Sequence, residues 1–257
     1  MPAVSESSLD SRGFVISASL LRDKVASFED YPFNLPAVKP LETLSLHRAV
    51  TFIVGENGSG KSTLLEGLAV ALGFNAEGGS RNFNFATRAS HSDLGKHLRI
   101  ARSHRRPRTG YFLRAESFYN VATEIERLDM LGGPPLMDAY GGTSMHEQSH
   151  GESFLALILN RFGPEGLYLL DEPEAALSPA RQLTLLARMH QLVQQGSQFI
   201  IATHSPILLA YPDAVILVLG ETGMSHVRYE DTGHYQLTRQ FLNNPQGIMK
   251  ALFRSEK

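Results

Sequence analysis

The residues best suited to chemistry form a glycine-rich loop, Gly55-Glu-Asn-Gly-Ser-Gly-Lys61-Ser62. Glycine is needed at several positions of such a loop because the backbone must approach phosphate oxygens and turn its N–H groups inward. We expect Lys61 to reach the β- and γ-phosphates of a nucleotide and the Ser62 hydroxyl to bind Mg²⁺. The predicted phosphate-binding residues are Gly55, Glu56, Asn57, Gly58, Ser59, Gly60, Lys61, Ser62 and Thr63.

Two adjacent carboxylates, Asp171 and Glu172, follow the apolar run at residues 167–170. Ligands of parallel sheets bind at the C-terminal ends of the strands. We expect Asp171 to hold Mg²⁺, usually through a water, and Glu172 to orient or deprotonate an attacking water. Alone, this pair also fits an ordinary surface, but together with the phosphate loop it indicates nucleotide hydrolysis.

Two further segments stand at informative distances from Asp171. Ser149-His-Gly-Glu152 begins 22 residues before it and opens a predicted helix, so the Ser149 hydroxyl and nearby N–H groups form a second anion site. His204 follows 33 residues after Asp171, directly behind a predicted strand. Each segment alone also fits a purely structural role, as a helix cap or as a polar residue at a strand end. Their order and spacing favour a role in nucleotide binding and hydrolysis.

The predicted elements place these segments at one edge of a sheet. The apolar run at 49–54 predicts a buried strand before the phosphate loop, and leucine spacing at 62–72 predicts a helix after it. Other strands are predicted at 14–20, 111–113, 167–170, 198–202 and 214–219, and helices at 118–131, 153–162 and 179–195. Alternating strands and helices predict an α/β fold with a mostly parallel sheet flanked by helices.

Through these motifs, in this order, residues 50–210 resemble the ABC ATPase superfamily, and more narrowly the SMC, RecF and related stand-alone ATPases. The resemblance implies a P-loop NTPase fold of the ABC type, with a small helical and loop insertion lobe. It implies ATP hydrolysis with ATP and Mg²⁺ as cofactors, and Lys61, Glu172 and His204 as catalytic residues. The phosphate loop corresponds to Walker A and the Asp-Glu pair to Walker B.

The resemblance also implies that the partner is a second copy of the chain. Residues 148–152 correspond to the signature segment, in which Ser149 binds the γ-phosphate held by the other subunit, and Gly151 and Glu152 are further ATP-binding residues. Two ATP molecules are then sandwiched in a head-to-tail dimer, and hydrolysis requires dimerisation.

Three departures from the family pattern stand out. His150 occupies a signature position where most members have Gly, and Ser178 replaces the usual Asp of the D-loop. No Gln stands at the expected Q-loop position; we take Glu116 as its replacement and as a ligand of Mg²⁺ through water, with Arg114 second. Glu116 also fits a solvated acid at a helix N-terminus. We expect the adenine ring to stack on Tyr31 or Phe33, although either side chain suits packing in the core equally well.

Composition indicates a single domain. The 257 residues carry a net charge of −2 and no Cys, which excludes disulfides and thiolate metal sites. We expect a mobile tail at 1–12 and one ABC-type domain at 13–257, with an insertion at about 74–148. The apolar runs are shorter than the ~18 residues that cross a bilayer, so we expect a cytoplasmic protein without a transmembrane segment.

The process served by hydrolysis is indicated by the insertion. It is too short for the coiled-coil arms of SMC proteins, and residues 116–149 are fewer than the several-helix lobe of transport ATPases needs. A basic cluster suits contacts with nucleic-acid phosphates, and we take a DNA or RNA transaction in repair or defence as the hypothesis. A solvated loop, a protein partner, or the ATP-binding subunit of a membrane transporter are the alternatives. The cluster consists of Lys96, Arg99, Arg102, Arg105, Arg106 and Arg108.

Overall fold

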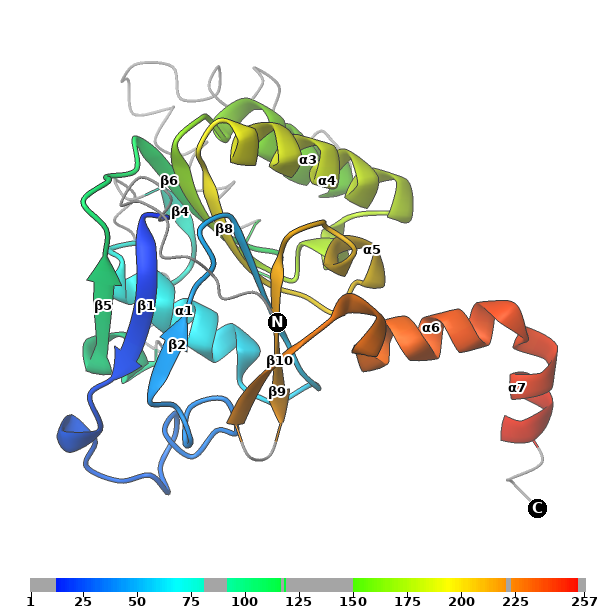
Figure 1. Ribbon diagram of the computed structural model, residues 1–257, viewed down its shortest axis with the longest axis horizontal. Coiled ribbons are helices and arrows are strands. Elements are labelled where there is room, and N and C mark those ends of the chain that lie inside the picture. Colours follow the sequence, from blue (N-terminus) through cyan, green and yellow to red (C-terminus); the bar gives the residue numbers. More distant parts are fainter. Residues whose placement is uncertain (1–12, 81–91, 117, 119–149, 221–222, 254–257) are drawn as a thin grey trace, which may run out of the picture.

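The structure is a computed structural model that describes residues 13–80, 92–116, 118, 150–220 and 223–253 (Figure 1). The predicted tail at 1–12, the predicted helix at 118–131 and much of the predicted insertion therefore lie outside the described residues.

A seven-stranded sheet forms the centre, in the order β10-β9-β3-β8-β7-β6-β4. Its five inner strands, from β9 to β6, run parallel, and the two edge strands β10 and β4 pair antiparallel. The predicted mostly parallel sheet is thereby confirmed. The strands are β3 (Val50–Val54), β4 (Gly79–Ser80), β6 (Thr109–Arg114), β7 (Gly166–Asp171), β8 (Gln198–Ala202), β9 (Val215–Gly220) and β10 (Gly223–Val227).

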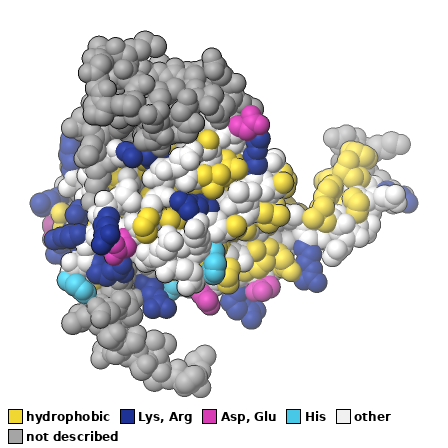
Figure 2. Space-filling model, turned by 90° about the horizontal axis from the view of Figure 1, so that it is seen from above, with side chains coloured by type: hydrophobic (Ala, Val, Ile, Leu, Met, Phe, Trp, Pro, Cys, Tyr) yellow, Lys and Arg dark blue, Asp and Glu magenta, His cyan; other side chains and the backbone are white. Residues whose placement is uncertain are grey.

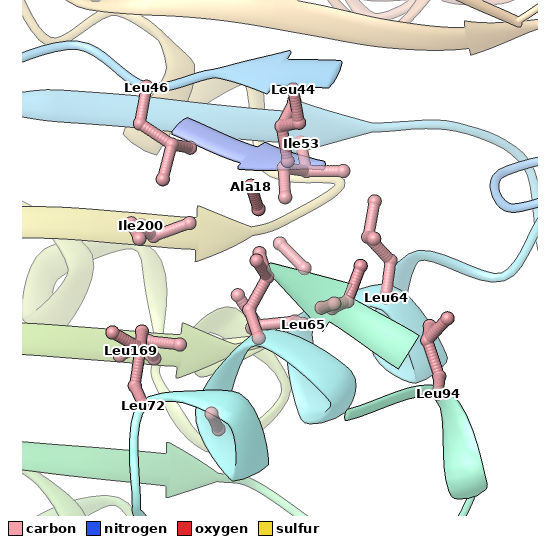
Figure 3. Packing of buried hydrophobic residues seen from close by; sticks show 14 of the residues in the cluster. Ala18, Leu44, Leu46, Ile53, Leu64, Leu65, Leu72, Leu94, Leu169 and Ile200 are labelled. Atoms are coloured by element: carbon pink, nitrogen blue, oxygen red, sulfur yellow. The ribbon is translucent and has the colours of Figure 1, made fainter. Parts of the chain in front are cut away.

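Helices cover both faces of this sheet, because alternate side chains of the buried strands point to opposite sides. On β3, Phe52 enters a core with α3 and α4, whereas Ile53 enters a second core with α1. Figure 3 shows Ile53, Leu169 and Ile200 of three strands facing Leu65 of α1. The helices are α1 (Lys61–Ala71), α3 (His150–Arg161), α4 (Pro179–Gln194), α5 (Pro206–Leu209), α6 (Gly233–Asn243) and α7 (Pro245–Leu252), with short 3-10 turns at Arg22–Lys24, Asp93–His97, Pro173–Ala176 and Tyr229–Asp231.

A separate three-stranded antiparallel sheet packs over α1. It has the order β2-β1-β5, from β1 (Val15–Leu20), β2 (Thr43–Ser45) and β5 (Leu98–Arg102). Buried Gln198 of β8 joins it to the central sheet, because its amide accepts from Val15 N at 2.9 Å and donates to Val15 O at 2.8 Å. The strand predicted at 14–20 is confirmed, and β5 adds a strand that the sequence pattern did not reveal.

The last two helices form a projecting C-terminal arm, α6 and α7 (Figure 1). Neither helix buries a residue completely, and Figure 2 shows hydrophobic side chains gathered on the arm. Leu237, Leu242 and Phe253 are 67%, 70% and 65% exposed. In the part of the chain that the structure describes, every helix is too short or too polar to span a membrane.

Candidate functional site

The phosphate loop is a tight turn between β3 and α1. Gly58 and Gly60 have φ of 79° and 94°, a left-handed conformation that favours glycine. A Cβ at Gly60 would also lie 3.2 Å from Leu35 and Ala37, so the loop packs closely on the preceding segment. The Ala37 amide donates to Ser59 O at 3.0 Å and braces the turn. The N-terminus of α1, which carries a partial positive charge, therefore lies at this loop.

Lys61 is the buried cation of the site. Its side chain is only 4% exposed, and Nζ donates to Glu56 O at 3.2 Å. Nζ also lies 3.9 Å from the Glu172 carboxylate. Burial lowers the pKa of Lys61, while Glu172 and then Asp171 raise it. The ammonium is thus held over the loop, where its attraction for phosphate oxygens is weakly screened.

Asp171 and Glu172 stand at the C-terminal end of β7, as predicted. Glu172 adopts a left-handed conformation with φ of 49°, and its amide donates to Ala202 O of β8 at 2.9 Å. Such a conformation costs about 1–2 kcal/mol for a residue with a side chain. It turns the chain sharply after the strand, and the Glu172 carboxylate points back to Lys61 rather than away from the sheet.

Asp171 has the surroundings that a Mg²⁺ ligand needs. Burial raises its pKa to about 6, against the lowering effects of the Arg114 charge and a hydrogen bond from Ser62. Among the described residues its Oδ1 atom has no hydrogen-bond partner. A buried carboxylate oxygen near a serine hydroxyl fits a hard cation, which completes its shell with water and phosphate oxygens. The site residues are therefore compatible with Mg²⁺.

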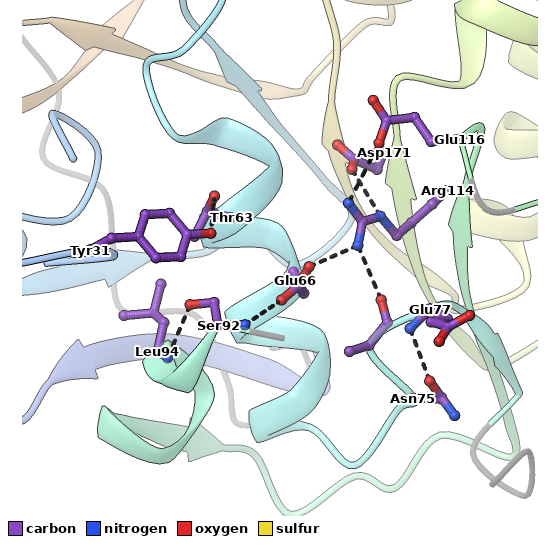
Figure 4. Close-up of polar contacts among 11 residues, drawn as sticks. Tyr31, Thr63, Glu66, Asn75, Glu77, Ser92, Leu94, Arg114, Glu116 and Asp171 are labelled. Atoms are coloured by element: carbon purple, nitrogen blue, oxygen red, sulfur yellow. Dashed lines mark hydrogen bonds and ion pairs between the residues drawn. The ribbon is translucent and has the colours of Figure 1, made fainter. Parts of the chain in front are cut away.

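Arg114 binds beside this carboxylate (Figure 4). The parallel register of β6 and β7 sets Arg114 opposite Asp171, and its Nε lies 3.5 Å from Oδ2. The guanidinium also contacts Glu66 of α1 at 2.7 Å. Glu116 stands 4.0 Å from the same guanidinium with 89% of its side chain exposed. The Arg114 side chain thus lies against the Walker B carboxylate, and the role of Glu116 as a metal ligand stays a prediction.

His204 follows β8 and reaches the same cluster. Its amide donates to Glu174 Oε1 at 2.5 Å, and its Nε2 lies 3.5 Å from Glu172 Oε1. Its other ring nitrogen, Nδ1, lies 3.0 Å from Nε2 of His234 on α6. The structure therefore brings Lys61, Glu172 and His204 together, and their catalytic roles stay predictions. His234 was missed, because a lone His 30 residues further on carries no sequence signal of this contact.

The described part of the signature segment, Gly151 and Glu152, packs against the D-loop (residues 176–178) and the start of α4. Ser149 lies outside the described residues, and α3 begins at the next residue. A Cβ at Gly151 would come within 2.7 Å of Ala176 O, so glycine is required there, and Glu152 pairs with Arg181 at 3.0 Å. Ser178 caps α4 by accepting from the Arg181 amide at 3.4 Å. The serine that replaces the usual Asp thus keeps a helix-capping role.

The two candidate aromatic residues for adenine have different surroundings. Phe33 is 9% exposed and packs edge-on against Phe28 and His97, with ring centroids 6.4 and 4.9 Å away. Tyr31 is 62% exposed, and its hydroxyl lies 3.5 Å from Thr63 Oγ1 at the end of the phosphate loop. Figure 4 shows this ring beside α1. Tyr31 is the ring that remains available for stacking.

The predicted basic cluster lies on β5 and the segment after it. Arg105 is partly used by the fold, since it donates to Gly196 O at 3.3 Å and covers the Phe14 ring at 4.8 Å. Arg108 pairs with Glu165 at 2.5 Å. The remaining exposed arginines of the cluster are Arg99, Arg102 and Arg106. They form the basic surface.

Two protein families match consecutive parts of the chain. One, described as an AAA domain, matches residues 25–125. The other, described as an AAA domain and proposed AbiEii toxin of a Type IV TA system, matches residues 138–210. Together the matches include the phosphate loop, the signature segment, the Asp-Glu pair and His204.

Curated relatives include both transport and chromosome proteins. The hemin import ATP-binding protein HmuV of Ruegeria sp. is 30% identical over 200 residues, which are 68% of this chain and 73% of HmuV. ABC transporter G family member STR2 of Medicago truncatula is 27% identical over 77% of this chain, which spans 29% of STR2. Chromosome partition protein Smc of Methanocaldococcus jannaschii is 33% identical over 33% of this chain, which spans 8% of Smc.

Solved structures share the fold. CbiO1 of Clostridium perfringens, part of the ABC transporter complex cbiONQ, has a TM-score of 0.52 at 16% identity and covers 93% of this chain and 100% of its own. A metal-chelate-type ABC transporter in an inward-facing conformation has a TM-score of 0.50 at 19% identity and covers 88% of both chains. The fold and the phosphate loop define a P-loop NTPase. With HmuV as a relative, the chain belongs to the ABC-type ATPases, enzymes that bind and hydrolyse ATP.

Proposed function

We propose that two copies of this chain bind two ATP·Mg²⁺ head to tail and hydrolyse them, each site combining the phosphate loop of one copy with Ser149, Gly151 and Glu152 of the other. The observation that carries the proposal is the placement of Glu172, whose carboxylate lies 3.9 Å from Lys61 and 3.5 Å from His204. The first turn of α3 is not part of this cluster: the contacts described for it are with the D-loop and α4 of the same chain. This arrangement supports a signature segment that acts on the partner's nucleotide.

ATP hydrolysis at this cluster requires a general base for the attacking water and positive charge near the γ-phosphate. Glu172 orients a water and accepts its proton as the oxygen attacks the γ-phosphorus; the bond from phosphorus to the bridging oxygen breaks, and ADP and phosphate leave. Lys61 and His204 offset the negative charge on the transferred group. Ser62 and Asp171 would hold Mg²⁺, which would supply further positive charge to the nucleotide phosphates. Tyr31 stacks on the adenine.

A composite site makes the rate depend on chain concentration. At saturating ATP and Mg²⁺ we expect ATP turnover per chain to rise with concentration from nanomolar to micromolar and then reach a plateau, because only dimers are active. An inert carrier protein at constant mass controls for adsorption. Turnover per chain that stays constant over the whole range, with the protein monomeric throughout by light scattering, would contradict the dimer.

We further propose that hydrolysis drives a nucleic-acid transaction in repair or defence, with DNA or RNA bound along the basic surface. Arg99, Arg102 and Arg106 are exposed, and the part of the chain that the structure describes gives Arg99 and Arg106 no ion pair. Free guanidinium groups suit phosphate contacts. We also propose that residues 13–257 form one catalytic domain with an insertion at about 74–148, and that the protein is cytoplasmic.

Charge reversal tests the basic surface. In the triple variant Arg99→Glu, Arg102→Glu, Arg106→Glu we expect nucleic-acid affinity to fall, and the slope of log affinity against log salt to become shallower by about 0.9 for each lost phosphate contact with duplex DNA. Fluorescence anisotropy at several salt concentrations measures both. The matched control reverses three other exposed charges, Arg48, Arg239 and Lys250.

The relationship to HmuV favours a second candidate, the ATP-binding subunit of a membrane transporter. Absence of DNA and RNA binding by the unmodified protein at low salt would contradict the nucleic-acid proposal. Co-purification with a membrane protein, unaffected by the charge reversals, would favour the transporter instead.

A further inference from the structure

His234 is a polar residue in contact with the catalytic cluster that the proposed mechanism does not use. It occupies the first turn of α6, and its Nε2 lies 3.0 Å from His204 Nδ1. The two rings have centroids 5.1 Å apart and are inclined at 55°. The contact joins the C-terminal arm to the residue expected to touch the γ-phosphate.

The start of α6 is held firmly in place. Thr232, which is 1% exposed, caps the helix by accepting from the Tyr235 amide at 3.3 Å. Just before it, the Tyr229 hydroxyl donates to Pro206 O at 2.9 Å, and Pro206 begins α5 two residues after His204. Both histidines are therefore attached to the same short piece of structure, and their separation is set by the fold.

The neighbours of His204 favour one direction for this hydrogen bond. If His204 Nδ1 donated to His234, a neutral His204 would keep a lone pair on Nε2, directed at the Glu172 carboxylate, which is an acceptor too. If His234 Nε2–H donates instead, His204 carries its proton on Nε2, where it can donate to a carboxylate or a phosphate. Among the described residues this Nε2 is buried and has no hydrogen-bond partner, as suits a donor kept for substrate.

The surroundings of His234 keep it in the neutral form that has one N–H. Burial lowers the pKa of His234, and His204 lowers it further, while Glu56 raises it and Lys61 lowers it. Which ring nitrogen of a neutral histidine carries the proton is decided by the hydrogen bond that the other nitrogen makes.

We propose that His234 is a positioning residue for ATP hydrolysis, whose Nε2–H donates to His204 Nδ1 and thereby directs the Nε2–H of His204 toward the γ-phosphate. The inference rests on the proposed role of His204 in the same site. Groups that orient a metal-bound imidazole through its other ring nitrogen contribute about 10–100-fold to metal affinity or activity, and we expect an effect at the lower end of this range here. Because His234 belongs to α6, this hydrogen bond also makes the γ-phosphate contact depend on the position of the arm.

Four variants in the full-length protein test the proposal: His234→Ala, His234→Gln, His204→Ala and the double variant His204→Ala/His234→Ala. We expect His234→Ala to lower kcat about ten-fold and to change ATP affinity less than two-fold. Glutamine should restore most of kcat, because its terminal amide can donate from nearly the same point. In the His204→Ala background, replacing His234 by alanine should not lower kcat further, since His234 acts through His204.

Two controls separate positioning from folding. Alanine is a better helix former than histidine, so His234→Ala should leave α6 formed, and circular dichroism and the melting temperature check this. His226→Ala removes an exposed histidine on β10 and should leave kcat unchanged. Long-range ¹H–¹⁵N NMR should show the Nε2–H tautomer of His204 in the unmodified protein and a mixture of tautomers in His234→Ala.

The outcomes distinguish this inference from the function on which it rests. If His204→Ala lowers kcat but His234→Ala does not, the role of His234 is overturned and the proposed site stands. Equal losses from His234→Ala with and without His204 would mean that its effect is structural, and would also overturn it. If His204→Ala retains normal kcat, the proposed role of His204 fails first. Should alanine at 234 lower the melting temperature, the NMR tautomer of His204 in His234→Gln decides.

Discussion

Replacement of Lys61 by alanine is expected to abolish ATP binding while the protein stays folded. The Lys61 ammonium is almost completely buried, and Glu56 O and the Glu172 carboxylate lie around it. Charge-assisted hydrogen bonds to phosphate in such a place are strong, and a loss of about 3 kcal/mol corresponds to more than a 100-fold loss of affinity. Isothermal titration calorimetry with ATP and Mg²⁺ measures the change.

The matched control is Lys96→Ala, which removes an exposed lysine paired only with its neighbour Asp93 at 2.7 Å in the part of the chain that the structure describes. ATP affinity should be unchanged there. The melting temperature without nucleotide shows whether Lys61→Ala is folded. A folded Lys61→Ala protein that binds ATP as tightly as the unmodified chain would mean that the nucleotide phosphates lie elsewhere.

The phosphate loop and its strand and helix could be predicted because their causes are local. Glycine at a left-handed position, an apolar β-branched run before it and leucines at helical spacing after it are all readable within 25 residues. The same holds for Asp171 and Glu172, since the buried strand that presents them is a short apolar run. Within the described residues, the predicted helix and strand ends differ from the observed ones by at most three residues, where hydrogen bonding rather than composition decides.

Contacts between distant segments could not be predicted in the same way. The strand at 14–20 was recognisable, yet its partner β5 lies about 80 residues later, and no pattern announces that register. Arg114 is the clearest case within the site. Sequence reasoning ended the strand at residue 113, whereas the parallel register of β6 and β7 extends one residue further and places Arg114 opposite Asp171. The guanidinium beside the Asp171 carboxylate is thus a consequence of strand pairing.

Two aromatic residues that are close in the sequence can also have different surroundings in the fold. Tyr31 and Phe33 were equivalent candidates by position, but Phe33 enters the core beneath β5, and Tyr31 lies exposed beside α1. Residue type alone does not decide this, because Tyr111 and Tyr168 of the same chain are completely buried. The position of the core was therefore needed to tell the two rings apart.

Replacement of Glu172 by glutamine is expected to keep ATP bound while hydrolysis falls about 1,000-fold, within the range for loss of a general base. Glutamine has the same shape, but its amide cannot accept the proton of the attacking water. It also removes a negative charge that lies 3.9 Å from Lys61 and would repel the γ-phosphate. ATP should therefore bind at least as tightly, and the ATP-bound state should accumulate.

If each ATP joins two chains, that accumulated state is a dimer. Light scattering of Glu172→Gln at micromolar concentration should give the mass of two chains with ATP and Mg²⁺, and of one chain without nucleotide. Glu230→Gln, which alters an exposed acid before α6, should remain monomeric after its ATP is hydrolysed. A Glu172→Gln protein that binds ATP and stays monomeric would exclude the sandwich, because bound nucleotide would then have its complete site within one chain. A dimer would instead mean that Lys61, Asp171 and Glu172 form only half of a site. The signature segment at the start of α3 in the second chain would supply the other half.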